Sequence, residues 1–151
     1  MAELQARLAV LNADYARCID DDRLEEWPGF FLERCLYKIT TADNVAKGYE
    51  AGLVYADSRA MLKDRVSALR EANVYERQRY RHIVGLPAVR DGGAVETPFL
   101  VVRIMRDGKM DLFATGRYLD RISDLNGSLK FEERIVVCDS SRFDTLLAIP
   151  L

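Results

Sequence analysis

An α+β fold is predicted, in which helices pack on the concave face of one curled antiparallel sheet. Two patterns carry this prediction. Apolar residues recur at helical spacing early in the chain, whereas the stretch from Val95 to Asp139 reads as three long strands joined by tight turns. Helices gathered before antiparallel strands are typical of the α+β class, and long strands curl, which leaves a concave face for helices to cover.

The three strands are separated by dipeptides that favour hairpin turns. Phe99 to Arg106 is rich in apolar and β-branched residues, and it ends at Asp107-Gly108. Met110 to Ile122 follows, and Asn126-Gly127 repeats the same turn chemistry before the last strand, Leu129 to Asp139. The alternation along this last strand predicts one shared face for Leu129, Phe131, Glu133, Ile135 and Val137.

The first part of the chain is predicted to be mainly helical. The range from Glu3 to Cys18 has one apolar stripe and therefore indicates an amphipathic helix. Asp22 and Glu25 have the spacing of a capping box, which predicts a short second helix. Cys35 to Thr41 alternates like a strand.

A loop, a third helix and a further strand are predicted before the meander. Thr41 to Lys47 is polar and loop-like, and Asp57 or Ser58 can cap a helix from Arg59 to Ala72. From Val74 to Val89 the alternation places Tyr80 and His82 on one strand face. It places Arg77, Arg79 and Arg81 on the other.

Length and composition predict one folded domain spanning residues 1–151. A chain of 151 residues can bury about 68–70% of its unfolded surface, and 49% hydrophobic with 30% charged residues argues against long disorder. A net charge of -2 and a pI near 5.5 argue against nucleic acid as a partner. Neither a signal peptide nor an apolar stretch of membrane-spanning length is visible, which predicts no membrane partner.

The residues that could hold a metal are few. His82 is the only histidine, and Cys18, Cys35 and Cys138 are scattered along the chain, without a Cys-x-x-Cys pair. Reduced thiols of this kind predict a cytoplasmic location. Non-haem iron sites and Rieske clusters each need two histidines, so neither can be assembled from this chain alone. The expectation is therefore no metal and no cofactor in this chain.

An acid/base pocket at the mouth of the cone is the alternative. The residues that could form it are Asp14, Tyr15, Tyr55, Asp57, Tyr80 and His82. A histidine beside a buried aspartate, such as His82 beside Asp57, could move a proton. The opposing interpretation makes His82 a hydrogen-bonded core residue and the tyrosines core-lining residues.

Two features indicate contact with another protein chain. Arg77, Arg79 and Arg81 form a row on the outward strand face, where arginines suit carboxylate partners, although a solvated face with intramolecular glutamates explains them equally well. The other feature is the apolar end of the sequence. Its candidate interface residues are Leu146, Leu147, Ile149 and Leu151. This segment either folds back onto its own domain or docks on another chain.

Several blocks of the sequence resemble the small (β) subunits of aromatic-ring-hydroxylating dioxygenases. They are residues 13–16 (Ala-Asp-Tyr-Ala), 26–28 (Glu-Trp-Pro), 56–58 (Ala-Asp-Ser), 61–65 (Met-Leu-x-Asp-Arg) and 80–82 (Tyr-Arg-His). The similarity extends over essentially the whole chain. It implies a cone-shaped fold like that of nuclear transport factor and ketosteroid isomerase, of the cystatin-like kind.

The resemblance also implies which subunit of such an enzyme carries which cofactor and role. Three large (α) and three small subunits form a hexamer, and the large subunit holds the Rieske two-iron cluster and a mononuclear Fe(II). Electrons from NAD(P)H arrive through a separate reductase, and the substrate is an aromatic carboxylate that undergoes cis-dihydroxylation. The small subunit holds the assembly together and contributes no catalytic residue.

Three functions follow as hypotheses. The first is a structural subunit of such a dioxygenase, which predicts that the isolated chain binds no iron. The second is a stand-alone isomerase or dehydratase, which requires a polar, ligand-sized pocket with a titrating pair. The third is a small self-associating binding module, which a pull-down from the native host would separate from the first.

Overall fold

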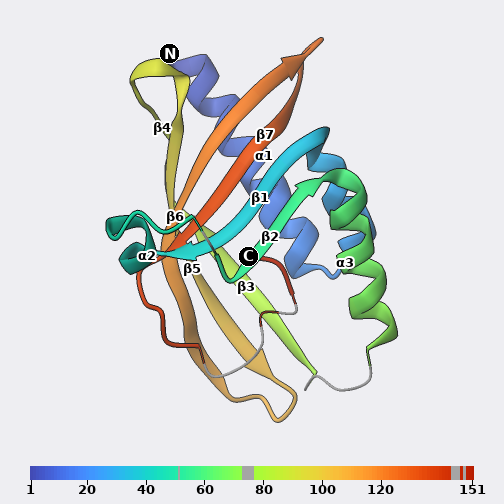
Figure 1. Cartoon of the computed structure of the whole chain (residues 1–151). Coiled ribbons are helices and arrows are strands. Elements are labelled where there is room, and N and C mark those ends of the chain that lie inside the picture. Colours follow the sequence, from blue (N-terminus) through green and yellow to red (C-terminus); the bar gives the residue numbers. More distant parts are fainter. Residues whose placement is uncertain (51, 73–76, 144–146, 148) are drawn as a thin grey trace.

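The computed structural model describes residues 1–50, 52–72, 77–143, 147 and 149–151. The helices in chain order are α1 (Ala2–Asp20), the 3₁₀ helix η1 (Leu24–Phe30), α2 (Ala42–Ala46), α3 (Arg59–Glu71) and the 3₁₀ turn η2 (Asp91–Gly93). The strands are β1 (Phe31–Thr41), β2 (Val54–Ser58), β3 (Gln78–Val84), β4 (Ala88–Val89), β5 (Val95–Met105), β6 (Met110–Leu125) and β7 (Ser128–Cys138). The predicted α+β class is confirmed, because the helices pack against a curled sheet (Figure 1).

One strand pairing differs from the prediction. Within the described residues the sheet has the order β2-β1-β7-β6-β5-β3, and β4 pairs with β5. Neighbours in this order run antiparallel except β1 and β7, which run parallel, so the sheet is mixed rather than purely antiparallel. A hairpin turn fixes the direction of strands that follow each other, but β1 and β7 are far apart in the sequence and share no turn.

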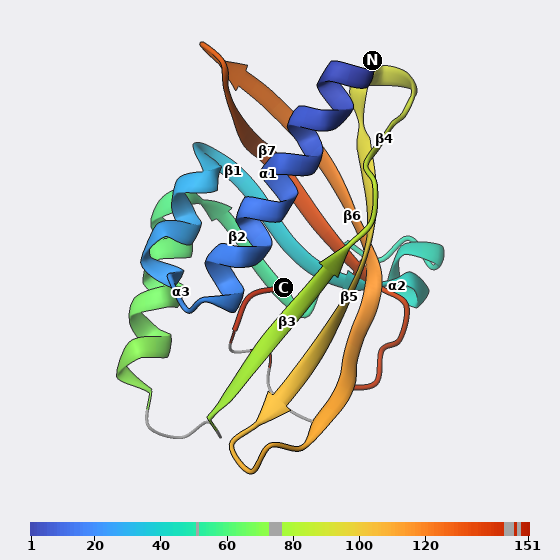
Figure 2. The same ribbon diagram turned by 180° about the vertical axis from the view of Figure 1, so that it is seen from behind.

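Helices cover the concave face of the sheet. Figure 2 shows α1 lying across this face, with α3 beside it at the end formed by β1 and β2. The helix predicted from Glu3 to Cys18 is confirmed as α1, and its buried side chains include Leu8, Tyr15 and Ile19. The helices therefore supply one wall of the core and the sheet supplies the other.

Side-chain caps begin two of the helices. The predicted cap of α3 is confirmed, because the Ser58 hydroxyl accepts a hydrogen bond of 3.2 Å from the Met61 N–H. The segment from Thr41 to Lys47, predicted as a loop, contains the short helix α2. The Thr41 hydroxyl caps it by accepting from the Asn44 N–H. A polar segment this short carries no apolar stripe, so its helical turn is not visible in the sequence pattern.

The predicted capping box at Asp22 and Glu25 is wrong. Asp22 has a φ of 60°, and η1 begins after Arg23 without a side-chain cap. The two carboxylates bind the Arg70 guanidinium of α3 instead, at 2.9 Å from Asp22 and 2.8 Å from Glu25. The acidic spacing therefore serves a contact between helices rather than a helix start.

The strand predicted from Val74 to Val89 is shorter in the structure. β3 spans Gln78–Val84 and β4 spans Ala88–Val89, while residues 74–76 lie outside the described residues. The predicted alternation is confirmed along β3. Tyr80 and His82 are buried, whereas Arg79 and Arg81 are exposed.

Both predicted hairpin turns are present in the meander. Gly108 adopts a φ of 90° between β5 and β6. Between β6 and β7, Asn126 and Gly127 have φ values of 54° and 90°, the left-handed region that such turns require. These turns set the antiparallel register of β5, β6 and β7.

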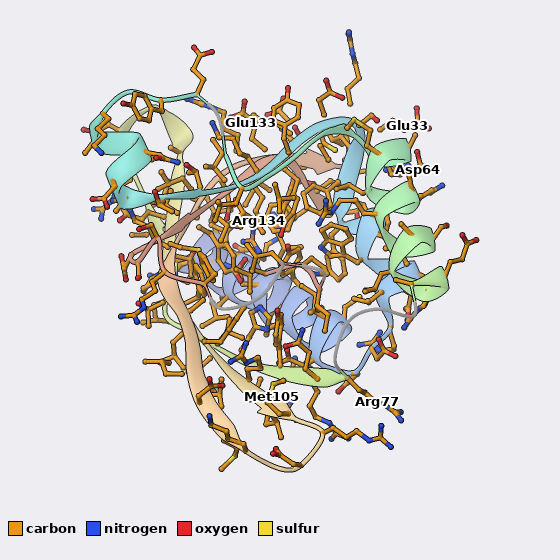
Figure 3. The ribbon with its side chains drawn as sticks, turned by 60° about the horizontal axis from the view of Figure 1, so that its bottom comes forward. Glu33, Asp64, Arg77, Met105, Glu133 and Arg134 are labelled. Atoms are coloured by element: carbon orange, nitrogen blue, oxygen red, sulfur yellow. The ribbon has the colours of Figure 1, made fainter. Side chains whose placement is uncertain are left out.

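A bulge in β7 overturns the predicted face of this strand. Ile122 of β6 pairs with Phe131, but the preceding residue, Arg121, pairs with Glu133, so one extra residue interrupts the alternation. Beyond the bulge, Arg134 and Val136 face the core instead of Glu133 and Ile135, whereas Phe131 and Val137 of the predicted set are buried. Figure 3 shows Arg134 in the middle of the molecule and Glu133 pointing away from it.

Candidate functional site

The interior of the cone is filled by side chains where a catalytic pocket would lie. Trp27, Phe31, Tyr37 and Leu62 are all fully buried. The Trp27 ring lies edge-on to Tyr37 at a centroid distance of 5.1 Å, and Phe31 lies 5.8 Å from Tyr37. Edge-to-face rings at these distances pack favourably, so this cluster stabilises the fold.

A buried ion pair lies at the centre of the core. Arg134 donates two hydrogen bonds to Asp120, from Nε at 2.9 Å and from Nη2 at 2.8 Å, and its Nη2 also donates to the Asn12 side-chain oxygen. Both charged side chains are 0% exposed. Burial lowers the pKa of Arg134, but Asp120 more than compensates, so this pKa lies above its ordinary value. Burial also raises the pKa of Asp120, which the charge of Arg134 opposes.

Aromatic rings enclose the Arg134 guanidinium. The central guanidinium carbon of Arg134 (Cζ) lies 3.8 Å from the ring centroid of Tyr118, 4.0 Å from that of Phe131 and 4.4 Å from that of Tyr15. The cation–π contacts and the bidentate hydrogen bonds to the Asp120 carboxylate together compensate the positive charge of Arg134. Among the described residues Arg134 Nη1 has no hydrogen-bond partner, but the whole side chain is buried, so the pair acts as part of the scaffold.

His82 pairs with Asp20, not with Asp57. The His82 Nδ1 lies 2.7 Å from one Asp20 carboxylate oxygen, and the His82 main-chain N–H donates to the other at 2.8 Å. Asp57 is exposed on β2, at the opposite end of the strand order from β3. The interpretation of His82 as a hydrogen-bonded core residue is confirmed.

The other predicted pocket residues do not converge. Asp14, Tyr55 and Asp57 are exposed, whereas Tyr15 and Tyr80 are buried in the core. Within the described residues, His82 Nε2 has no hydrogen-bond partner, and its side chain lines neither of the two hollows beside β6. The geometry required for the stand-alone isomerase is therefore not assembled from these groups.

Two hollows that open to solvent, lined by described residues, lie beside β6. One hollow has a volume of about 210 Å³, and a second of about 200 Å³ shares four of its lining residues, which are Leu112, Phe113, Arg142 and Phe143. They carry no histidine, so they do not supply a histidine–carboxylate pair.

The predicted arginine row lies on the convex side of the sheet. Arg77, Arg79 and Arg81 are exposed, and within the described part of the chain none of them forms an ion pair. The glutamates that could pair with this row within the chain are Glu76, Glu132 and Glu133. Glu133 lies 3.8 Å from Arg121 instead, Glu132 is exposed, and residue 76 is outside the described residues. These arginines are therefore available to carboxylates of another chain.

Apolar side chains lie beside this row on the same face. The strand register places Val102 next to Arg81 and Ile104 next to Arg79. We name as the convex patch the outward side chains of β3, β5 and β6, which are Ile83, Leu100, Val102, Ile104, Met110 and Leu112. Ile83, Met110 and Leu112 are 58%, 70% and 63% exposed. A patch of apolar residues with a polar rim is typical of protein interaction surfaces.

The apolar segment at the end of the sequence folds back onto its own chain. We call residues 147 and 149–151 the C-terminal tail. Leu147 and Leu151 are buried, Ile149 packs against the core, and Leu146 lies outside the described residues. The Leu151 main-chain oxygen accepts hydrogen bonds from the hydroxyls of Tyr15 at 2.9 Å and Tyr37 at 3.0 Å. A contact of Leu147 or Leu151 with another subunit would require these side chains to leave the core.

The buried tyrosines predict a loss of stability in alkali. Burial raises the pKa of Tyr15 to about 12 and raises the pKa values of Tyr37 and Tyr118 well above their ordinary 10.0. Above pH 10 the unfolded chain releases these protons while the folded chain retains them. We expect the contribution of the tyrosines to be complete below about pH 10 and to decline progressively toward pH 12, measured by urea denaturation. A Tyr118→Phe variant should decline less steeply, and constant stability to pH 12 would contradict this account.

Comparison with known proteins decides the family. The model of the ring hydroxylating beta subunit family matches residues 14–145. The chain belongs to this family. It is 52% identical over 151 residues to subunit beta 1 of the terminal oxygenase component of terephthalate 1,2-dioxygenase from Comamonas sp, covering 97% of this chain and 98% of that relative.

Two further family members show the same relationship. The small subunit of anthranilate 1,2-dioxygenase from Burkholderia cepacia is 36% identical over 146 residues, covering 94% of this chain and 91% of the relative. A crystal structure assigned as the beta subunit of an aromatic-ring-hydroxylating dioxygenase from Novosphingobium aromaticivorans has a TM-score of 0.90 and 36% identity. The match covers 99% of this chain and 98% of the chain in that crystal structure. The predicted resemblance to ring-hydroxylating β subunits is confirmed in sequence and in fold.

The described residues of this ring-hydroxylating β subunit contain no group of three or more histidine, cysteine, aspartate or glutamate side chains placed to hold a metal ion. Among the same residues, no helix combines the length and the apolar character that crossing a membrane requires. Its relatives are named as subunits of dioxygenases, which are oxidoreductases.

Proposed function

We propose that this chain is the single-domain, non-catalytic small subunit of a cytoplasmic terephthalate 1,2-dioxygenase. A large subunit would hold the Rieske two-iron cluster and the mononuclear Fe(II), and a reductase would deliver electrons from NAD(P)H. Three copies of each subunit would form the assembly. The observation that carries the proposal is the identity of 52% over 97% of this chain to a subunit of that enzyme.

The use of the polar side chains supports a structural role. Arg134 and Asp120 neutralise each other in the core, and Asp20 holds His82. The hydroxyls of Tyr15 and Tyr37 bind the tail. These contacts all lie within the chain, which suits a subunit that positions another.

The contact with the rest of the enzyme is proposed to lie on the convex side. The convex patch supplies apolar area, and Arg77, Arg79 and Arg81 supply positive charge without a described carboxylate beside them. Arginines at the rim of an apolar patch suit a partner surface that carries carboxylates. The proposed contacts of Leu146, Leu147, Ile149 and Leu151 with a neighbouring subunit remain a prediction.

Reversing the charge of the row should break the assembly. We expect the Arg79→Glu/Arg81→Glu variant to bind the large subunit on the order of a hundredfold more weakly, because like charges at a contact cost several kcal/mol. The size of the mixture and its dioxygenase activity, with the reductase present, measure the effect. The matched control is Arg17→Glu/Lys63→Glu, which reverses exposed charges on α1 and α3.

Two results would refute different parts of this proposal. An unchanged complex in the Arg79→Glu/Arg81→Glu variant would place the contact elsewhere. Iron bound stoichiometrically to the isolated chain would contradict the non-catalytic role itself.

A further inference from the structure

The C-terminal tail ends at a set of hydrogen-bond donors that converge on one oxygen. The hydroxyls of Tyr15 and Tyr37 both donate to the Leu151 main-chain oxygen, at 2.9 and 3.0 Å. The Leu151 N–H in turn donates to the Tyr37 hydroxyl at 3.1 Å. Tyr15, on α1, and Tyr37, on β1, are both 0% exposed, so different elements hold this pair in place. Two buried donors aimed at one acceptor form a site that recognises a carbonyl or carboxylate oxygen.

Apolar side chains of the core cluster that contains Leu151 surround the two hydroxyls. Leu151 is 0% exposed, and so are Trp27, Phe31 and Leu62, which belong to the same core cluster. A cation lies close by, because Arg65 donates to the Leu147 main-chain oxygen at 3.2 Å. A few polar groups set in apolar walls are the usual composition of a small-molecule site.

The tail is held differently from the rest of the core. Its described residues belong to no helix or strand, so no ladder of main-chain hydrogen bonds fixes them. The segment that joins it to β7 includes Ser140, Ser141 and Arg142, which are exposed. Segments with few main-chain bonds are the ones that open most easily.

We propose that the tail occupies, as an internal ligand, a site that binds a carbonyl or carboxylate oxygen, and that a small apolar carboxylate can take its place. The ligand would resemble Leu151 in size, with its carboxylate oxygen between Tyr15 and Tyr37 and its apolar part against Trp27. The proposal does not depend on the dioxygenase function, because it concerns groups of this chain alone.

The test uses the full chain, cut only after it has folded. A protease site inserted between Ser140 and Ser141 lies in the exposed segment, so the tail can be severed without shortening the chain during folding. N-acetyl-leucine is the probe. Trp27, the only tryptophan, reports on the site because its ring lies 5.1 Å from that of Tyr37. We expect the severed tail to stay bound and the probe to release it, with a saturable fluorescence change and an unchanged circular dichroism spectrum.

Single hydroxyl deletions identify the site. Tyr37→Phe should weaken binding of N-acetyl-leucine by about tenfold or more, since it removes a donor to a charged acceptor. Tyr118→Phe is the matched control, because the Tyr118 hydroxyl is buried and, among the described residues, has no hydrogen-bond partner. Equal binding by the two variants would overturn the proposal, and so would a tail that leaves only when the chain unfolds.

Discussion

Replacing Asp120 by alanine is expected to destabilise the fold by about 3–5 kcal/mol, because it leaves the Arg134 charge buried and unpaired. Arg134 and Asp120 are both 0% exposed and share two hydrogen bonds. Urea denaturation of the purified chain measures the loss. The matched control is Asp124→Ala, which removes an exposed partner of Arg7 and should change stability little.

A double substitution separates the cost of the lone charge from the loss of the side chain. Asp120→Leu combined with Arg134→Met removes both charges and keeps apolar volume, so it should recover most of the stability that Asp120→Ala loses. If Asp120→Ala were as stable as the native chain, Arg134 could not be a desolvated cation.

Gly116→Ala is expected to lower the free energy of unfolding by about 1–3 kcal/mol, because a side-chain carbon there would overlap the β7 backbone. That carbon would collide with the Val137 carbonyl oxygen and lie 3.0 Å from the Cys138 Cα. Backbone atoms in a paired strand cannot move aside as a flexible side chain can.

Gly29→Ala is the control for this substitution. Gly29 is exposed, and a side-chain carbon there meets no atom within 4 Å. Thermal unfolding of the two variants should therefore differ clearly. Equal unfolding temperatures would show that β6 and β7 can separate at Gly116 without cost.

Sequence patterns predicted local structure well where the determinants are local. The helix α1, the Ser58 cap and the turns at Gly108 and Asn126-Gly127 each depend on residues within a few positions of one another. The bulge in β7 and the parallel pairing of β1 with β7 depend on strands that meet only after folding. Periodicity along one strand carries no information about either.

The candidate site shows the same division. The exposed face of Arg79 and Arg81 follows from alternation along one strand, and so does the buried face of His82. The partner of His82 was missed because Asp20 stands in a run of three aspartates that reads as a helix end. Arg134 was assigned to the wrong face because the bulge lies just before it. Asp20 and Arg134 owe their contacts to tertiary structure alone.

The hydrogen bond from the His82 main chain to Asp20 also affects the exposed edge of the sheet at β3. β3 is the last strand of the order, so its outer main-chain groups could template a strand from another molecule. In the middle of that strand, the His82 main-chain N–H already donates a hydrogen bond to the Asp20 carboxylate. Strand addition along β3 would have to break this hydrogen bond, which disfavours edge-to-edge pairing of free chains. Association through the exposed side chains of this strand would leave the bond intact.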